Sequence, residues 1–116
     1  MSPYGFAEAN YLKKSEMSMK RTTSQITDFL RSHKDLFATE FKVIKIGIFG
    51  SCARGDVGEE SDIDIVVELE KPDLYYLIGV KQAVEEAFGG KVDVVRLRDK
   101  MNVTLKRRIE RDAIYV

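Results

Sequence analysis

The 116-residue chain is long enough for one hydrophobic core and too short for two, because single domains usually need about 100–150 residues. Hydrophobic residues make up 44% of the chain and charged residues 33%, which excludes a disordered or collagen-like protein. The 19 basic and 19 acidic residues cancel, and this balance argues against a protein whose main role is to coat nucleic acid.

Membrane and secretory proteins are disfavoured as well. No apolar run approaches the roughly 18–20 residues that cross a bilayer, and the first residues lack the basic and apolar segments of a secretory signal. Cys52 is the single cysteine, so no intrachain disulfide or cysteine-based zinc site is expected. We therefore expect a reduced, soluble, cytoplasmic domain without direct membrane or nucleic-acid binding.

The N-terminal part of the chain is predicted to be a tail followed by helix. Residues 1–20 lack periodicity and are predicted to be a tail, ahead of one domain over residues 22–116. Thr22 and Gln25 have the spacing of a capping box, so a helix is expected to begin there. Its apolar face is interrupted near His33, where we expect a helix end.

Three predicted strands alternate with a turn and a long helix. The strands are expected over residues 43–49, 63–69 and 92–95. A glycine-rich turn joins the first two, which should be antiparallel, while an apolar-striped helix over 74–88 has the length of a crossover between parallel neighbours. A last helix is expected over 101–110, followed by an apolar tail over 113–116. The predicted fold class is α/β in the α+β sense, with a small mixed sheet of three or more strands flanked by helices.

The charges are unevenly distributed along this fold. Residues 56–73 contain eight acidic side chains against Lys71 alone, and residues 96–111 contain seven basic ones against two acidic ones. An acidic middle suits a cation site, and a basic end suits a phosphate or an acidic partner. Ordinary solvated loops and helix faces account for many such charges equally well.

Aspartates stand at the starts of two predicted strands, where β propensity disfavours them. Asp62 and Asp64 are two residues apart, so both side chains should point to the same face, and parallel pairing would bring Asp93 beside them. Carboxylates about 5 Å apart repel by roughly 3 kcal/mol at an effective dielectric of about 20, and a divalent cation would relieve this repulsion. Oxygen ligands favour Mg²⁺ or Mn²⁺ over Zn²⁺. Taken alone, Asp93 is equally well explained as a solvent-facing turn residue.

Gly50 and Ser51 stand where the first strand ends, and a helical turn is predicted over 51–54. Gly50 permits close approach of an anion to the backbone, and Ser51 offers a hydroxyl and an amide where phosphate oxygens bind well. A phosphate cradle beside carboxylates is typical of phosphoryl or nucleotidyl transfer. The alternative for Ser51 is a structural helix cap, and Cys52 is interpreted as a small turn residue.

These motifs together resemble the signature of a known family. Gly50-Ser51, followed after ten residues by Asp62-Ile63-Asp64, resembles the signature of the polymerase-β-like nucleotidyltransferases. The chain is most similar to the minimal nucleotidyltransferases, or MNT domains, in these segments: residues 48–56, 61–67, 91–95, 108–110 and 113–116. The resemblance covers roughly residues 23–116 and implies the polymerase-β-like fold.

The resemblance also implies an activity, the transfer of AMP from ATP with pyrophosphate leaving. It assigns the catalytic and metal-binding roles to Asp62, Asp64 and Asp93. The metal it implies is two Mg²⁺ ions, or Mn²⁺ in their place. It assigns nucleotide binding to Gly50, Ser51 and Arg54. For Arg54 a structural salt bridge to Asp56 or Glu60 is an equally good interpretation.

The resemblance implies a partner as well. Similar minimal domains are antitoxins paired with a HEPN-domain ribonuclease toxin, which some of them silence by adenylylating a tyrosine, so a hetero-oligomer is expected. Two alternatives stay open: an antitoxin that acts by contact alone, and an aminoglycoside-type nucleotidyltransferase. The small size of the chain disfavours the second, because no further domain is expected to hold a small-molecule acceptor.

Overall fold

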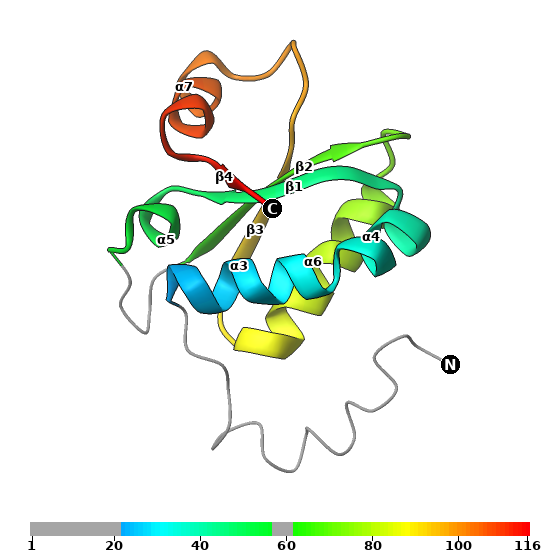
Figure 1. Ribbon diagram of the computed structural model, residues 1–116. Helices are drawn as coiled ribbons and strands as arrows, with labels where there is room; N and C mark the ends of the chain where they lie inside the picture. Colours follow the sequence, from blue (N-terminus) through cyan, green and yellow to red (C-terminus); the bar gives the residue numbers. More distant parts are fainter. Residues whose placement is uncertain (1–21, 57–61) are drawn as a thin grey trace.

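The computed structural model describes residues 22–56 and 62–116, so the predicted tail over 1–20 lies outside the described residues (Figure 1). The described helices are α3 (Thr23–Ser32), α4 (Lys34–Phe41), α5 (Ser51–Arg54), α6 (Leu74–Phe88) and α7 (Val103–Asp112). The strands are β1 (Val43–Phe49), β2 (Ile63–Leu69), β3 (Val92–Arg96) and β4 (Ile114–Tyr115). Over the described ranges, none of the helices has the length and apolar character needed to span a bilayer.

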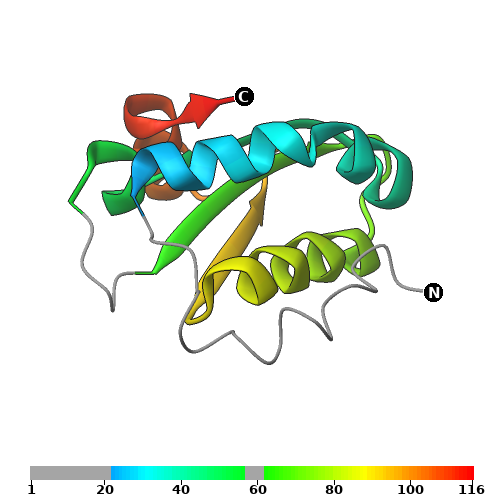
Figure 2. The same cartoon turned by 60° about the horizontal axis from the view of Figure 1, so that its bottom comes forward.

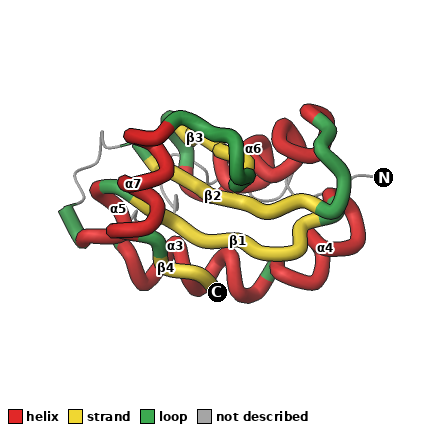
Figure 3. Tube along the Cα trace, turned by 90° about the horizontal axis from the view of Figure 1, so that it is seen from above, coloured by secondary structure: helices red, strands yellow, loops and turns green. Residues whose placement is uncertain are grey.

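The strands form one mixed sheet in the order β3-β2-β1-β4, which Figure 3 shows from above. β1 is antiparallel to β2 and β2 is parallel to β3, as the turn and the crossover helix predicted. The fourth strand was not predicted: Ile114 and Tyr115 pair with Ile48 and Gly47 of β1 instead of forming a loose tail. Gly47 permits this pairing, because a Cβ there would lie 2.5 Å from the Ile114 carbonyl oxygen.

Side-chain caps fix where α3 and α7 begin. The Thr22 hydroxyl accepts a hydrogen bond from the Gln25 amide at 3.1 Å, so the predicted start of α3 is confirmed. His33 ends α3, also as predicted. The last helix begins later than the predicted residue 101, because the Asn102 side chain caps it by accepting from the Leu105 amide at 3.1 Å.

The main core lies on one face of the sheet, under α3, α4 and α6. Figure 1 shows these three helices on the opposite side of the sheet from α7, and Figure 2 shows them running across that face. Four alternate residues of β2 point into this core: Ile63, Ile65, Val67 and Leu69. Gly79 of α6 packs closely against α4, because a Cβ there would overlap the ring of Phe41.

The opposite face carries a smaller apolar group, which we call the α7 cluster. Its buried members are Phe49, Val66 and Ile109. Side chains alternate along a strand, so residues two positions apart point to the same face. Asp64 and Glu68 each lie two positions from Val66 and therefore share its face. The face under α7 therefore combines apolar packing with carboxylates, and the predicted site lies at its edge.

Candidate active site

Strand register places the three predicted aspartates on the face under α7. Asp64 and Asp93 are Cα partners in the parallel pairing of β2 and β3. The preceding pair along the two strands is Ile63 with Val92, and Asp62 comes directly before Ile63 in the sequence. The backbone therefore brings the starts of β2 and β3 together as the crossover helix predicted.

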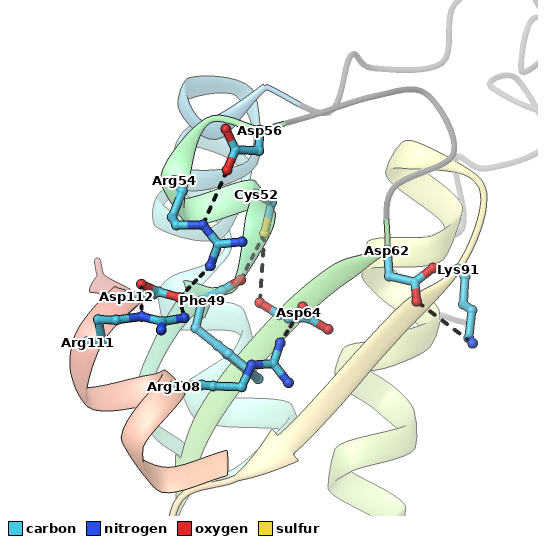
Figure 4. A network of polar contacts seen from close by, with 10 residues as sticks. All are labelled: Phe49, Cys52, Arg54, Asp56, Asp62, Asp64, Lys91, Arg108, Arg111 and Asp112. Atoms are coloured by element: carbon cyan, nitrogen blue, oxygen red, sulfur yellow. Dashed lines mark hydrogen bonds and ion pairs between the residues drawn. The ribbon is translucent and has the colours of Figure 1, made fainter. Parts of the chain in front are cut away.

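Two of the three carboxylates each lie near a cation, and the three do not form one tight group. Asp62 Oδ2 lies 3.8 Å from Lys91 Nζ, and Asp64 Oδ2 lies 3.7 Å from Arg108 Nη2 (Figure 4). Asp93 is exposed. In the part of the chain that the structure describes, no three Asp, Glu, His or Cys side chains lie close enough together to hold a metal ion. The convergence predicted from the sequence is present in the backbone register and not in the side-chain positions.

The surroundings of Asp64 shift its acid–base behaviour. Its side chain is 17% exposed, and this burial raises the pKa of the carboxyl above its usual value. The Arg108 guanidinium lowers that pKa, while the charges of Asp93 and Asp62 raise it. Asp62, Asp64 and Asp93 outnumber the two cations that pair with them, Lys91 and Arg108. Their oxygen-only donor set suits Mg²⁺ or Mn²⁺.

Gly50 forms the turn beside Asp64. Its φ of 72° and ψ of −151° define a backbone conformation that glycine adopts readily and that residues with a side chain avoid. A Cβ at Gly50 would lie 2.5 Å from Asp64 Oδ2 and 3.4 Å from Arg108 Nη2. The absence of a side chain at this position therefore leaves the carboxylate of Asp64 in direct reach of the turn backbone.

Ser51 is the first residue of α5, and Gly50 is the N-cap. No side chain caps this short helix, so the structural alternative of a capping serine is not observed at this turn. Ser51 is half-buried beside the Gly50 turn. Its assignment to phosphate binding stays a prediction.

Arg54 joins α5 to the end of α7. Its Nε lies 3.2 Å from Asp56 Oδ2, which is one of the predicted structural salt bridges, and its Nη1 donates to Asp112 Oδ2 at 2.7 Å. Asp112 is 4% exposed and also accepts from Arg111 Nε at 2.9 Å. Arg54 therefore has a structural role, its phosphate role stays a prediction, and Glu60 lies outside the described residues.

Cys52 belongs to the packing of the turn. Its Sγ lies 3.3 Å from the Phe49 carbonyl oxygen, and the side chain is buried in the main core. Burial raises the pKa of the thiol, which keeps it protonated and weakly nucleophilic. The interpretation as a small turn residue agrees with this position.

Sequence reasoning did not select Arg108 as a site residue. It appeared among the basic residues over 96–111 and in the segment 108–110 that resembles the MNT domains, with no role at the site, yet its guanidinium reaches Asp64 from α7. The one available signal was its position beside the buried Ile109 in an amphipathic helix. That signal places Arg108 near the sheet without showing which strand end it faces.

Comparisons with known proteins agree with this geometry. The family model described as "Nucleotidyltransferase domain" matches residues 30–116. The chain is 42% identical over 97 residues to "Putative protein adenylyltransferase MJ0128" of Methanocaldococcus jannaschii, covering 83% of this chain and 99% of the relative. It is 33% identical over 96 residues to protein adenylyltransferase MntA of Thermococcus cleftensis, covering 82% and 96% respectively.

Two solved structures share the fold. The first, "Structure of putative minimal nucleotidyltransferase", is 27% identical with a TM-score of 0.59, and the match covers 86% of this chain and 97% of that one. The second is a chain of the complex between the tri-AMPylated HEPN toxin of Shewanella oneidensis and the MNT antitoxin, matched at 21% identity and a TM-score of 0.54 over 77% of this chain and 70% of that one. At 21% identity the second likeness shows the fold alone.

Proposed function

Because the chain belongs to the nucleotidyltransferase domain family, we propose that it transfers AMP from ATP to a hydroxyl group of a partner protein. One observation carries the proposal: the in-register pair of Asp64 and Asp93 lies beside the glycine turn at Gly50. The relatives at 42% and 33% identity bear the name protein adenylyltransferase, which supports a protein as the acceptor.

The proposed reaction is a displacement at the α-phosphorus of ATP. The acceptor oxygen bonds to this phosphorus, the bond to the pyrophosphate oxygen breaks, and the acceptor loses its proton to solvent. Asp62, Asp64 and Asp93 are the residues that would hold Mg²⁺, which when bound activates the acceptor hydroxyl and neutralises charge on the leaving pyrophosphate. Gly50 and Ser51 would orient the β- and γ-phosphates through the backbone and the hydroxyl.

We propose a tyrosine of a HEPN-type toxin as the acceptor, with this chain as the antitoxin. A phenol has a pKa near 10, so forming the attacking phenolate takes less free energy than deprotonating an aliphatic hydroxyl. A chain of the complex between an AMPylated HEPN toxin and its MNT antitoxin shares the fold of this chain, which supports the pairing with a HEPN toxin. The exposure of Asp93 leaves one side of the site open to an acceptor that a second protein presents.

The decisive experiment compares transfer with neutralisation. Wild type, incubated with ATP labelled at the α-phosphate, Mg²⁺ and the HEPN partner, should label the partner, whereas Asp93→Asn should not. The matched control is Asp35→Asn, which removes an exposed carboxylate from α4 on the other face of the sheet. An Asp93→Asn variant that binds the toxin and fails to neutralise it supports catalysis, and one that neutralises it fully supports an antitoxin that acts by contact alone.

Metal binding is tested separately by thermal unfolding. Mg²⁺ or Mn²⁺ should raise the Tm, and ATP should raise it further, because ligands that bind the folded state stabilise it. The double variant Asp62→Asn, Asp64→Asn should stay folded and lose the metal-dependent shift. An equal shift in wild type and double variant would contradict the metal assignment.

A further inference from the structure

Arg108 is the one cation of α7 that the described structure places against the candidate site. Its Nη2 lies 3.7 Å from Asp64 Oδ2 and would lie 3.4 Å from a Cβ at Gly50. The guanidinium also lies over the Phe49 ring, 5.6 Å from the ring centroid. Figure 4 shows the side chain extending from the helix toward Asp64. Arg108 therefore stands where the carboxylate of β2 and the turn after β1 meet.

The contacts of Arg108 are looser than those of the other arginines nearby. Arg54 and Arg111 donate hydrogen bonds to Asp112 at 2.7 Å and 2.9 Å, which holds both guanidinium groups in place. The Arg108–Asp64 contact is an ion pair at 3.7 Å, and the Arg108 side chain is 45% exposed. Because an ion pair at this distance lacks the geometry of a short hydrogen bond, the guanidinium is free to exchange its anionic partner.

We propose that Arg108 binds the β- and γ-phosphates of the nucleotide, exchanging its contact with Asp64 for the triphosphate. The proposal rests on the proposed function. A guanidinium matches phosphate oxygens in a bidentate geometry, and Gly50 leaves backbone room at the same point. A divalent cation held by Asp64 would compete with the guanidinium for the carboxylate, and the triphosphate would supply the alternative partner.

This exchange predicts effects of opposite sign when the guanidinium is removed. Arg108→Gln frees the Asp64 carboxylate, so the protein without nucleotide should bind Mn²⁺ more tightly, by about three-fold. The same variant loses a phosphate contact, so it should bind ATP about ten-fold more weakly. AMP lacks the β- and γ-phosphates, and its affinity should change less than two-fold. A merely structural arginine would not separate ATP from AMP or tighten metal binding.

The experiment measures binding of Mn²⁺ alone, Mg²⁺-ATP and AMP by calorimetry, without the partner protein so that no transfer occurs. Arg108→Lys keeps the charge without the planar fork and should recover part of the ATP affinity. Arg107→Gln is the matched control, because Arg107 is the exposed neighbour on α7, and it should leave all three affinities unchanged. Circular dichroism and melting curves establish that each variant is folded.

Four results would overturn the inference, one of them together with the proposed function. Equal losses of ATP and AMP affinity in Arg108→Gln would remove the triphosphate assignment, and weaker Mn²⁺ binding would remove the exchange at Asp64. A wild type that binds Mn²⁺ and no ATP would instead overturn the proposed function together with this inference. A wild type that binds ATP, with Arg108→Gln indistinguishable from it, would overturn the inference alone.

Discussion

The two faces of the sheet carry different kinds of side chain, although both are built from alternate residues of the same strands. Under α3, α4 and α6, β2 contributes Ile63, Ile65 and Val67, each fully buried. Under α7, the alternate positions are Asp64, Val66 and Glu68, and only Val66 is buried. This strand therefore presents only apolar side chains to one face, and two carboxylates on either side of Val66 to the other.

This difference shows how a small domain can hold uncompensated carboxylates and still fold. Burial of aliphatic side chains stabilises by about 1.5–3 kcal/mol each, and three helices concentrate it on one face. The charged face contributes little packing beyond the α7 cluster. Violations of ordinary strand propensity, such as Asp64 in β2, are thus confined to the face on which the proposed chemistry lies.

The largest expected effect comes from two adjacent residues that point to opposite faces. Asp64→Asn should reduce AMP transfer by about 10³-fold, because metal-held carboxylates supply several kcal/mol of transition-state stabilisation. It should not lower the free energy of unfolding at neutral pH, because it removes a buried like charge. Ile65→Ala should lower the free energy of unfolding by about 2–5 kcal/mol and leave the activity of the folded fraction unchanged.

Transfer rate per folded molecule and urea unfolding check both variants. Ile65→Val, which removes one methylene from the same site, should cost only about 0.5–1.5 kcal/mol and serves as the graded control. An Asp64→Asn protein that is destabilised as strongly as Ile65→Ala would mean that the two faces are not separated in this way.

The next effect compares two glycines that share a positive φ. Gly50 has a φ of 72° and Gly55 a φ of 82°, so alanine should strain both backbones by about 1 kcal/mol. At Gly50 the new methyl group would collide with Asp64, whereas at Gly55 it would meet no atom of the described residues within 4 Å. Gly50→Ala should therefore slow transfer by about 10²-fold, and Gly55→Ala should be destabilised without losing activity. Similar kinetics for both variants would contradict a role for the Gly50 approach to Asp64.

The parts of this molecule that local patterns govern could be predicted from the sequence. The capping residues, the alternation of apolar side chains and the lengths of the connections predicted the β1–β2–β3 pairing, and that pairing in turn brought Asp64 to Asp93. The two-residue strand β4 escaped prediction because its formation depends on the space above Gly47 rather than on its own sequence.

Contacts between distant segments could not be predicted in the same way. Arg54 contacts Asp112, which lies 58 residues away in the sequence. Arg108 of α7 contacts Asp64 on the sheet face that α7 covers. Both contacts depend on how α7 sits on the sheet, which the small apolar face of the helix does not specify. Asp62 and Asp64 of the predicted metal site likewise pair with cations that the aspartate motif itself does not reveal.

The charged contacts of α7 also predict a pH dependence. The hydrogen bond from Arg111 holds the pKa of the Asp112 carboxyl below its ordinary value of 3.8, and Arg54 acts in the same direction. Since the folded-state pKa is lowered, the contribution of Asp112 to stability is present above pH 3.8 and is lost as the pH falls through the folded-state value. The difference in unfolding free energy between wild type and Asp112→Asn should therefore be constant near neutral pH and shrink below pH 3.8.

Urea unfolding at several pH values measures this difference. Asp28→Asn is the matched control, because Asp28 pairs with Arg31 at 3.0 Å on the outside of α3 with both side chains more than 60% exposed. An exposed pair of this kind contributes little, so Asp28→Asn should stay close to wild type throughout. A constant difference for Asp112→Asn down to pH 2 would show that its ion pairs do not hold α7 on the sheet.

The smallest expected effect concerns Ser51, which lies at the junction of the two faces, between Gly50 and the buried Cys52. Because Gly50 is the N-cap of α5, Ser51→Ala removes no capping hydrogen bond and should change the free energy of unfolding by less than about 0.5 kcal/mol. If the hydroxyl binds a phosphate oxygen, the same variant should weaken ATP binding or slow transfer several-fold, which corresponds to about 1 kcal/mol. Ser51→Thr retains the hydroxyl and adds a methyl group beside the turn, so its ATP affinity should lie between those of wild type and Ser51→Ala. ATP titrations beside melting curves separate the two roles: lost stability with unchanged ATP binding would make Ser51 a residue of the turn, whereas weakened ATP binding at unchanged Tm would place its hydroxyl at the phosphates.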